Sequence, residues 1–224
     1  MPTVLLDLDN TLINTDSTTA ELQKLLKQHN LQNSFDKLYL KAKNLFGYAN
    51  LNYVLKELEP ELRLQKISKN KIIATITEVE PMPRAKELIE LLIEQQAIFY
   101  IFTDGNKNIQ LKKIANLNKI VPINKNHVIV EANKAEKILE TIDKIKLRDK
   151  RLIIIDDKLK VLETIREKLK SSKFEYYLIW HCFGSHNKDY LNNKKLKTTV
   201  GKNLKIKPCL NLKEVIKILK RNLL

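Results

Sequence analysis

The chain has 224 residues, of which 43% are hydrophobic and 30% are charged, and its formal net charge is +15. This length fits one compact domain with a sizeable insertion. No apolar run approaches the ~20 residues of a transmembrane helix, and an apolar strand pattern begins almost at the first residue, which leaves no room for a signal peptide. We therefore expect a soluble, cytoplasmic protein with no membrane partner.

The first predicted strand, Val4-Leu5-Leu6, leads into Asp7-Leu8-Asp9. Side chains alternate between the two faces of a strand, so Asp7 and Asp9 would point the same way if the chain stayed extended. Two like charges at the end of an apolar strand are costly unless a cation is bound there. Mg²⁺ prefers oxygen and is commonly held by one or two carboxylates together with substrate phosphate. The competing interpretation is a strand that runs into a polar turn.

Residues 14–80 show helical periodicity and no convincing strand. The predicted helices cover residues 20–29, 35–46, 52–58 and 62–77. Pro81 and Pro83 then mark a return to the core, because proline disfavours helical structure in the residue before it. We expect a helical domain at 14–80, inserted into a core formed by 1–13 and 81–224.

Two later apolar runs, 97–102 and 151–155, also end in polar residues. The first stops at Thr103-Asp104-Gly105 and the second at Asp156-Asp157. Both runs are short and rich in β-branched or aromatic residues, which is typical of strands buried on both faces of a parallel sheet. Helical patterns alternate with them, at 85–95, 109–117, 135–146 and 161–171. The sequence therefore predicts a doubly wound α/β fold, whose ligands bind beyond the carboxyl ends of the strands.

A lysine is needed to balance these carboxylates, and Lys134 is the best candidate. It follows the apolar run 128–130 and precedes the helical pattern at 135–146, so it lies at the same edge of the sheet. This position ranks it above Lys125 and Lys137, although most lysines of the chain must be solvated.

The residues after Thr103 carry two further expectations. Gly105 allows the backbone to turn so that its N–H can face a phosphate. Asp104 either adds a negative charge near the site or caps the helix that begins around Lys107. We favour the cap, because Asp is a common N-cap residue.

In this order, the motifs resemble those of the haloacid dehalogenase superfamily over essentially the whole chain. The matching residues are Asp7-Leu8-Asp9-Asn10-Thr11, Thr103, Lys134 and Asp156-Asp157. The resemblance implies a Rossmann-like core with a central parallel sheet, and a helical cap of the C1 type at 14–80. It implies a nucleophile at Asp7 and a general acid/base at Asp9. It also implies two sets of ligands: Thr103, Asp104, Gly105 and Lys134 for phosphate, and Asp7, Asp9, Asp157 and Asp156 for Mg²⁺.

The function implied by this resemblance is a Mg²⁺-dependent phosphomonoesterase that acts on a small phosphorylated metabolite through an aspartyl-phosphate. Relatives that break carbon–halogen bonds do not keep an acid at the position of Asp9, because a halide leaves without a proton, so we do not expect dehalogenation. To carry a proton, Asp9 should have its pKa raised by neighbouring carboxylates. A phosphomutase or phosphotransferase, and a non-catalytic protein that binds nucleic acid or another polyanion, remain alternatives.

The positive charge comes from 35 Lys against 6 Arg and is spread along the chain. Sites that read bases or grip phosphates favour the rigid fork of Arg, so the composition disfavours a nucleic-acid partner without excluding one. The densest basic region, 186–207, is expected to be an exposed loop or hairpin between strands at 175–180 and 207–210, and a polyanion would bind there. A last amphipathic helix is expected at 212–224. Nothing in the sequence predicts the oligomeric state.

Overall fold

The computed structural model describes residues 1–46, 50–147, 149–184, 187 and 206–222. Within these residues, a parallel sheet of six strands has the order β3-β2-β1-β4-β5-β6. The strands are β1 (Thr3–Leu6), β2 (Ile98–Asp104), β3 (Val128–Glu131), β4 (Arg151–Asp156), β5 (Glu175–His181) and β6 (Ile206–Cys209). The predicted α/β class with a Rossmann-like core is confirmed.

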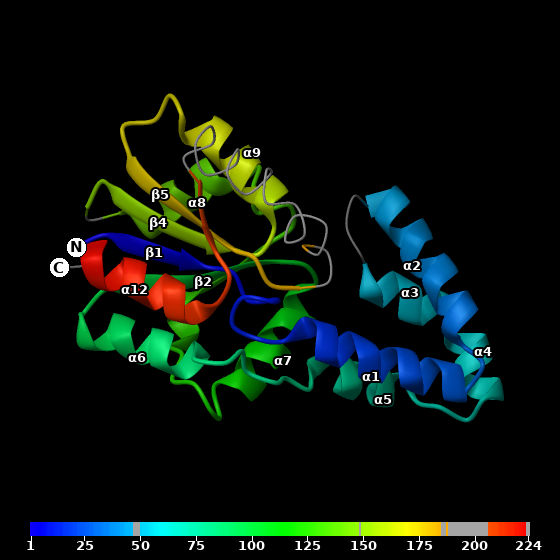
Figure 1. Cartoon of the computed structure of the whole chain (residues 1–224). Helices are drawn as coiled ribbons and strands as arrows, with labels where there is room; N and C mark the ends of the chain where they lie inside the picture. Colours follow the sequence, from blue (N-terminus) through cyan, green and yellow to red (C-terminus); the bar gives the residue numbers. More distant parts are fainter. Residues whose placement is uncertain (47–49, 148, 185–186, 188–205, 223–224) are drawn as a thin grey trace.

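Helices cover both faces of the sheet, as Figure 1 shows. They are α6 (Ala85–Glu94), α7 (Lys107–Leu117), α8 (Ile138–Ile145), α9 (Leu159–Leu169) and α12 (Leu212–Asn222). Val4 and Leu6 of β1 pack into one hydrophobic cluster with α6, α7 and α12, whereas Leu5 packs into a second cluster with α8 and α9. This alternation follows the two-residue period of a strand, and it explains why β1 is apolar at each position from Val4 to Leu6.

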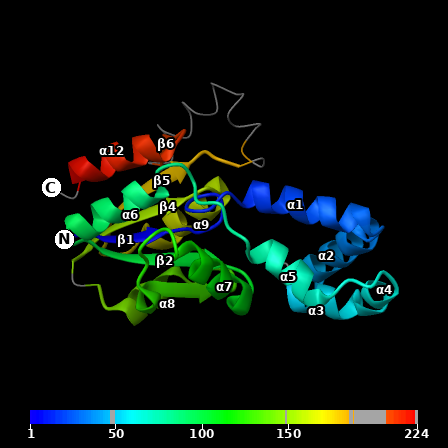
Figure 2. The same ribbon diagram turned by 90° about the horizontal axis from the view of Figure 1, so that it is seen from below.

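Residues between β1 and β2 form a separate group of helices to one side of the sheet (Figures 1 and 2). These are α1 (Thr15–Gln28), α2 (Gln32–Phe46), α3 (Leu51–Glu57), α4 (Glu59–Leu64) and α5 (Lys69–Thr77). They enclose a hydrophobic cluster of their own, which includes Leu26, Val54 and Ile72 and which Ile109 of α7 joins. The helix predicted at 62–77 is divided, because Lys66 takes a left-handed conformation with φ +52° and Ser68 caps α5.

One local expectation was wrong. The strand β1 ends at Leu6, so Asp7 and Asp9 do not continue an extended chain. The left-handed Asn10, with φ +57°, turns the backbone just after them. Strands β5 and β6 run parallel, so they do not form a hairpin with each other. Most of the basic segment 186–207 lies outside the described residues.

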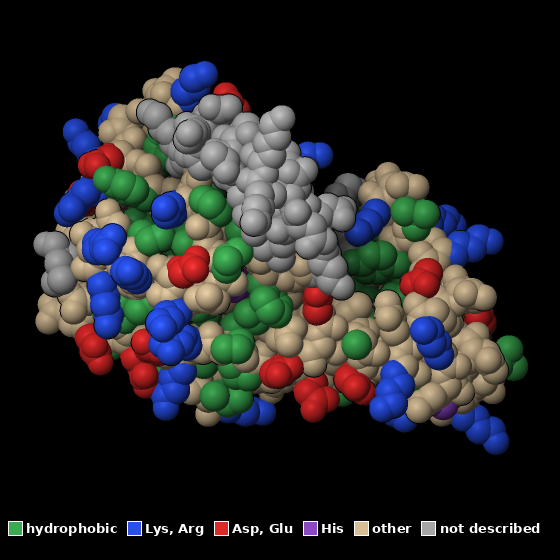
Figure 3. Space-filling view, in the orientation of Figure 1, with side chains coloured by type: hydrophobic (Ala, Val, Ile, Leu, Met, Phe, Trp, Pro, Cys, Tyr) green, Lys and Arg blue, Asp and Glu red, His purple; other side chains and the backbone are tan. Residues whose placement is uncertain are grey.

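Surface charge shows no single focus on the face drawn in Figure 3, where Lys and Arg side chains are scattered among acidic and apolar ones. Among the described residues, no helix combines the length and the hydrophobicity needed to cross a bilayer.

Candidate active site

The site lies at the carboxyl ends of β1, β2 and β4, which are neighbours in the sheet. The backbone N–H of Asp7 donates to Ile155 O at 2.9 Å, which extends the pairing of β1 with β4 by one residue. Thr103 belongs to the end of β2 and Asp156 to the end of β4. The parallel sheet therefore brings together three sequence motifs that are about 50 to 150 residues apart.

Asp7, Asp156 and Asp157 form an acidic trio, in which one carboxylate oxygen of each residue lies within 4.8 Å of the others. All three residues are buried, with exposed fractions of 3%, 1% and 1%. Burial raises the pKa of Asp7 well above its usual range, the Lys134 charge opposes that shift, and the charges of Asp156 and Asp157 add to it. Three carboxylates at such distances repel each other unless positive charge lies among them.

Lys134 supplies part of that charge and is itself 1% exposed. Its ammonium donates to Asp7, to Asp156 Oδ2 at 2.7 Å and to the carbonyl of Phe102 at 3.1 Å. Burial alone would lower the pKa of Lys134, but the charges of Asp156 and Asp7 outweigh it and raise the pKa, so the lysine stays charged. The structure thus brings the predicted lysine into direct contact with the predicted nucleophile.

The trio fits a divalent cation such as Mg²⁺. Its donors are all carboxylate oxygens, which hard cations prefer. Lys134 contacts Asp7 Oδ1. The other oxygen, Oδ2, is buried and has no hydrogen-bond partner among the described residues, so it is available as a metal ligand. A single buried ammonium also leaves the three carboxylates with excess negative charge. Asp7, Asp156 and Asp157 are therefore the residues that could hold the ion.

Asp9 does not join this trio, contrary to the expectation that its side chain helps to bind the metal. Its carboxylate accepts hydrogen bonds from Lys113 Nζ at 2.6 Å, Gln110 Nε2 at 2.7 Å and Thr15 Oγ1 at 2.7 Å. The turn at Asn10 and the early end of β1 separate Asp9 from Asp7 in this way.

The pKa of Asp9 also differs from the expectation. Burial raises it, but the charge of Lys113 and the hydrogen bonds from Lys113, Gln110 and Thr15 lower it to about 2. The prediction that neighbouring carboxylates raise this pKa is wrong for this arrangement, because Asp9 faces a lysine and not the acidic trio. Asp9 is therefore ionised at neutral pH.

The residues at the end of β2 and directly after it lie at the site, and some of their hydrogen-bond partners differ from the expected ones. Thr103 is 1% exposed, and its hydroxyl oxygen accepts from Gln110 Nε2 at 3.1 Å. Asp104 does not cap α7, since Asn106 does so by accepting from the N–H of Ile109 at 3.2 Å. Asp104 Oδ1 instead accepts from the backbone N–H of Lys134 at 2.6 Å, which fixes the loop that carries the lysine. Gly105 has φ +120°, a conformation that favours glycine.

Sequence reasoning missed Gln110 and Lys113, which are 4% and 7% exposed. A signal for them was present, because both interrupt the face of α7 that is otherwise buried through Ile109, Ile114 and Leu117. A lysine on the buried face of a helix needs a charged partner, and Asp9 is that partner here.

Two other residues near the site were also missed. Lys158 directly follows the acidic pair. Partial burial lowers its pKa, but the charges of Asp7 and Asp157 outweigh this effect and raise it. Tyr39 of α2 lies close enough to Lys158 and Asp9 for both charges to act on its hydroxyl group. Among the helices between β1 and β2, α2 is therefore one that faces the site, through Tyr39.

The fold and the trio define an α/β protein with a buried acidic site at the carboxyl edge of its sheet. The family model of haloacid dehalogenase-like hydrolases matches residues 4–168, which is well over half of the chain. This chain belongs to that family of hydrolytic enzymes. A search of the curated proteins gave no match.

Solved structures with the same fold include three informative ones. YfnB of Bacillus subtilis, described as a HAD-hydrolase bound to magnesium, is 17% identical, with a TM-score of 0.61 and 98% of each chain covered. L-2-haloacid dehalogenase of Xanthobacter autotrophicus, with chloropropionic acid covalently bound, is 10% identical, with a TM-score of 0.59, and covers 98% of this chain and 99% of its own. A protein described as a phosphatase, from Clostridium difficile, is 16% identical, with a TM-score of 0.57 and 97% of each chain covered. At these identities the likeness shows the fold alone.

Proposed function

We propose that this protein is a Mg²⁺-dependent phosphomonoester hydrolase that acts on a small phosphorylated metabolite. The observation that carries the proposal is the acidic trio, two members of which, Asp7 and Asp156, contact Lys134. A phosphate dianion cannot approach a carboxylate nucleophile unless positive charge offsets their repulsion. The trio would provide that charge by holding a cation next to Asp7, and the YfnB relative is described as bound to magnesium.

Asp7 is the proposed nucleophile. One of its carboxylate oxygens attacks phosphorus, the ester bond breaks, and an aspartyl-phosphate forms as the alcohol leaves. Bound Mg²⁺ would neutralise charge on the phosphate oxygens and thereby lower the barrier to attack. Lys134 and the Thr103 hydroxyl would hold the phosphate, together with the N–H groups of the loop at Asp104 and Gly105. Water then attacks phosphorus and releases inorganic phosphate and free Asp7.

Asp9 is the proposed general acid/base. In the arrangement seen here it is a carboxylate, which suits it to take the proton of the attacking water. To protonate a leaving alkoxide, Asp9 must first gain a proton, which its ion pair with Lys113 opposes. A leaving group that needs no proton, such as p-nitrophenolate, should therefore be released most readily.

We also propose that the helices between residues 14 and 80 act as a cap that closes over the substrate. Their own hydrophobic cluster and the position of Tyr39 near Asp9 and Lys158 support this role. A cap that excludes water would favour small substrates.

The deciding experiment measures phosphate release from p-nitrophenyl phosphate and a panel of small phosphomonoesters, with Mg²⁺ and with a chelator. Asp7→Asn is the test variant, and Asp143→Asn, at an exposed position on α8, is its matched control. We expect turnover that requires Mg²⁺, disappears in Asp7→Asn and persists in Asp143→Asn. Chloride release from 2-chloropropionate serves as a second assay. Chloride release without phosphate release would assign the protein to the dehalogenases, and transfer between two sugar phosphates without hydrolysis would assign it to the mutases.

A further inference from the structure

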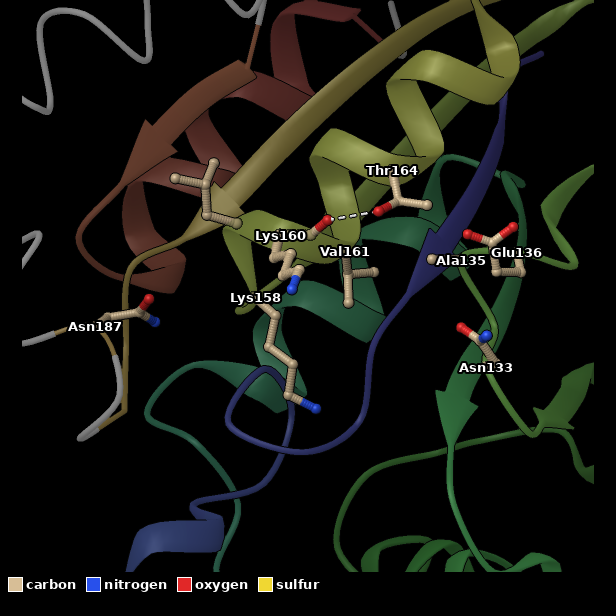
Figure 4. Close-up of a pocket in the computed structure, with 9 residues that line it drawn as sticks. Asn133, Ala135, Glu136, Lys158, Lys160, Val161, Thr164 and Asn187 are labelled. Carbon is tan, nitrogen blue, oxygen red and sulfur yellow. Dashed lines mark hydrogen bonds between the residues drawn. The ribbon is translucent and has the colours of Figure 1, made fainter. Parts of the chain in front are cut away.

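A cavity of about 450 Å³ lies beside the acidic trio, between the loop after β3 and the start of α9. Asn133 and Ala135 line it from either side of Lys134, and Lys158 lines it directly after Asp157. Figure 4 shows Lys158 and Lys160 on one side of this space and Asn133 and Glu136 on the other. Since the lining residues Ala135 and Lys158 directly follow the site residues Lys134 and Asp157 in the chain, the cavity borders the site, and a molecule whose phosphate lies at Asp7 could extend into it.

The charges around the cavity favour an anion. Within the described part of the chain, neither Lys158 nor Lys160 forms an ion pair with a carboxylate. The acid in the lining, Glu136, is already paired, since Lys168 Nζ lies 2.6 Å from its Oε2. Glu136 therefore does not neutralise Lys158 or Lys160.

Lys158 also links the cavity to the reacting centre. Its charge acts on Asp7 and Asp157 on one side and on the Tyr39 hydroxyl of α2 on the other. Because Lys158 lines the cavity and directly follows Asp157, an anionic group bound by Lys158 would lie next to the acidic trio. Lys134 does not fill this role, because it lies against Asp7 and Asp156 and is assigned to the phosphate that reacts at Asp7.

We propose that this cavity binds a second anionic group of the substrate, a carboxylate or a second phosphate, with Lys158 and Lys160 as its cationic partners. The inference rests on the proposed function, because it names the class of phosphomonoester that the enzyme takes. A lysine ammonium is a compact point charge that binds a carboxylate or a phosphate. The two lysines therefore predict an anionic group but do not distinguish between these two anions.

Binding of three matched phosphonates in the presence of Mg²⁺ tests the cavity without requiring turnover. Propylphosphonate carries one anionic group, 3-phosphonopropionate adds a carboxylate, and propane-1,3-bisphosphonate adds a second phosphonate. Isothermal titration gives the ratio of each two-anion affinity to that of propylphosphonate. For the wild type we expect at least one ratio of about tenfold or more, in line with hydrogen bonds to charged groups. The larger of the two ratios identifies the source of the second anion.

The double variant Lys158→Gln, Lys160→Gln should lose this preference, with the ratio falling to about one. Lys170→Gln removes an exposed lysine at the other end of α9 and should keep the wild-type ratio. A wild type that binds all three phosphonates equally, or a double variant that keeps the preference, overturns the proposal. Because these are binding measurements, an enzyme that shows the preference but releases no phosphate would contradict the phosphatase assignment and still support the anion site.

Discussion

The ammonium of Lys113 donates a hydrogen bond of 2.6 Å to the carboxylate of Asp9, and the two side chains come from elements more than 100 residues apart. Gln110, one turn earlier on α7, donates to the other oxygen of the same carboxylate at 2.7 Å. Asp9 is thus held by the helix that follows β2 and is kept apart from the acidic trio. This pairing governs the charge of the residue to which the resemblance assigns proton transfer.

Removing Lys113 should change the pH dependence of the enzyme. In Lys113→Met, the strongest influence that lowers the pKa of Asp9 is lost, so this pKa should rise from about 2 toward or above its usual value. If Asp9 works as a base, the fall of kcat/KM on the acid side should move to higher pH. A kcat/KM profile with p-nitrophenyl phosphate measures this shift. Lys112→Met, on the exposed face of α7, is the control, and an unchanged acid limb would rule out this role of the pair.

Asp9 should also contribute to acid sensitivity of the fold. Its pKa lies at about 2 in the folded protein and near 3.8 ordinarily, so its ionisation stabilises the fold above pH ~4. That contribution, about 2 kcal/mol, should be lost as the pH falls from 4 to 2. Urea unfolding of Asp9→Asn should show a lower free energy of unfolding at pH 6 and a smaller loss between pH 6 and 3. Equal pH dependence in wild type and variant would contradict the assignment, and Asp143→Asn is the control.

Asp7→Asn should stabilise the metal-free protein at neutral pH. Burial and two neighbouring carboxylates raise the pKa of Asp7, so its charged form costs folding free energy at pH 7. A neutral amide removes that cost, and we expect a gain of about 1 to 2 kcal/mol, typical of a group kept for function. Added Mg²⁺ should raise the Tm of the wild type more than that of the variant. A lower Tm for the variant without metal would show that its contact with Lys134 outweighs the repulsion.

Lys134→Met should have the opposite effect on stability. It leaves Asp7 and Asp156 without their buried ammonium, and breaking a buried ion pair typically costs about 3 to 5 kcal/mol. The loss should be largest without Mg²⁺ and should be partly restored by the ion, which thermal unfolding with and without Mg²⁺ can measure. Lys137→Met removes a more exposed lysine that pairs with Glu131, and its effect should stay within about 1 kcal/mol. Similar losses in both variants would argue against a special role for Lys134.

The sequence determined the strands, the helices between them and the polar residues at their ends. Short apolar runs rich in β-branched or aromatic residues are typical of strands in a covered parallel sheet, and such a sheet places Asp7, Thr103 and Asp156 at one edge. Lys134 followed from the same order of elements. These inferences succeeded because they depend on local periodicity and on the direction of parallel strands, which the chain order encodes.

Only the tertiary structure decided how the side chains at that edge pair with each other. Whether Asp9 faces Asp7 or Lys113 depends on where β1 ends and on the left-handed turn at Asn10. Asp104 accepts a hydrogen bond from the backbone of Lys134, and Asn106 caps α7 instead. This outcome depends on how closely the loop after β2 approaches the loop after β3. Such choices are set by distances of a few ångströms between segments far apart in the chain, over which charge interactions change sharply, and no local pattern records those distances.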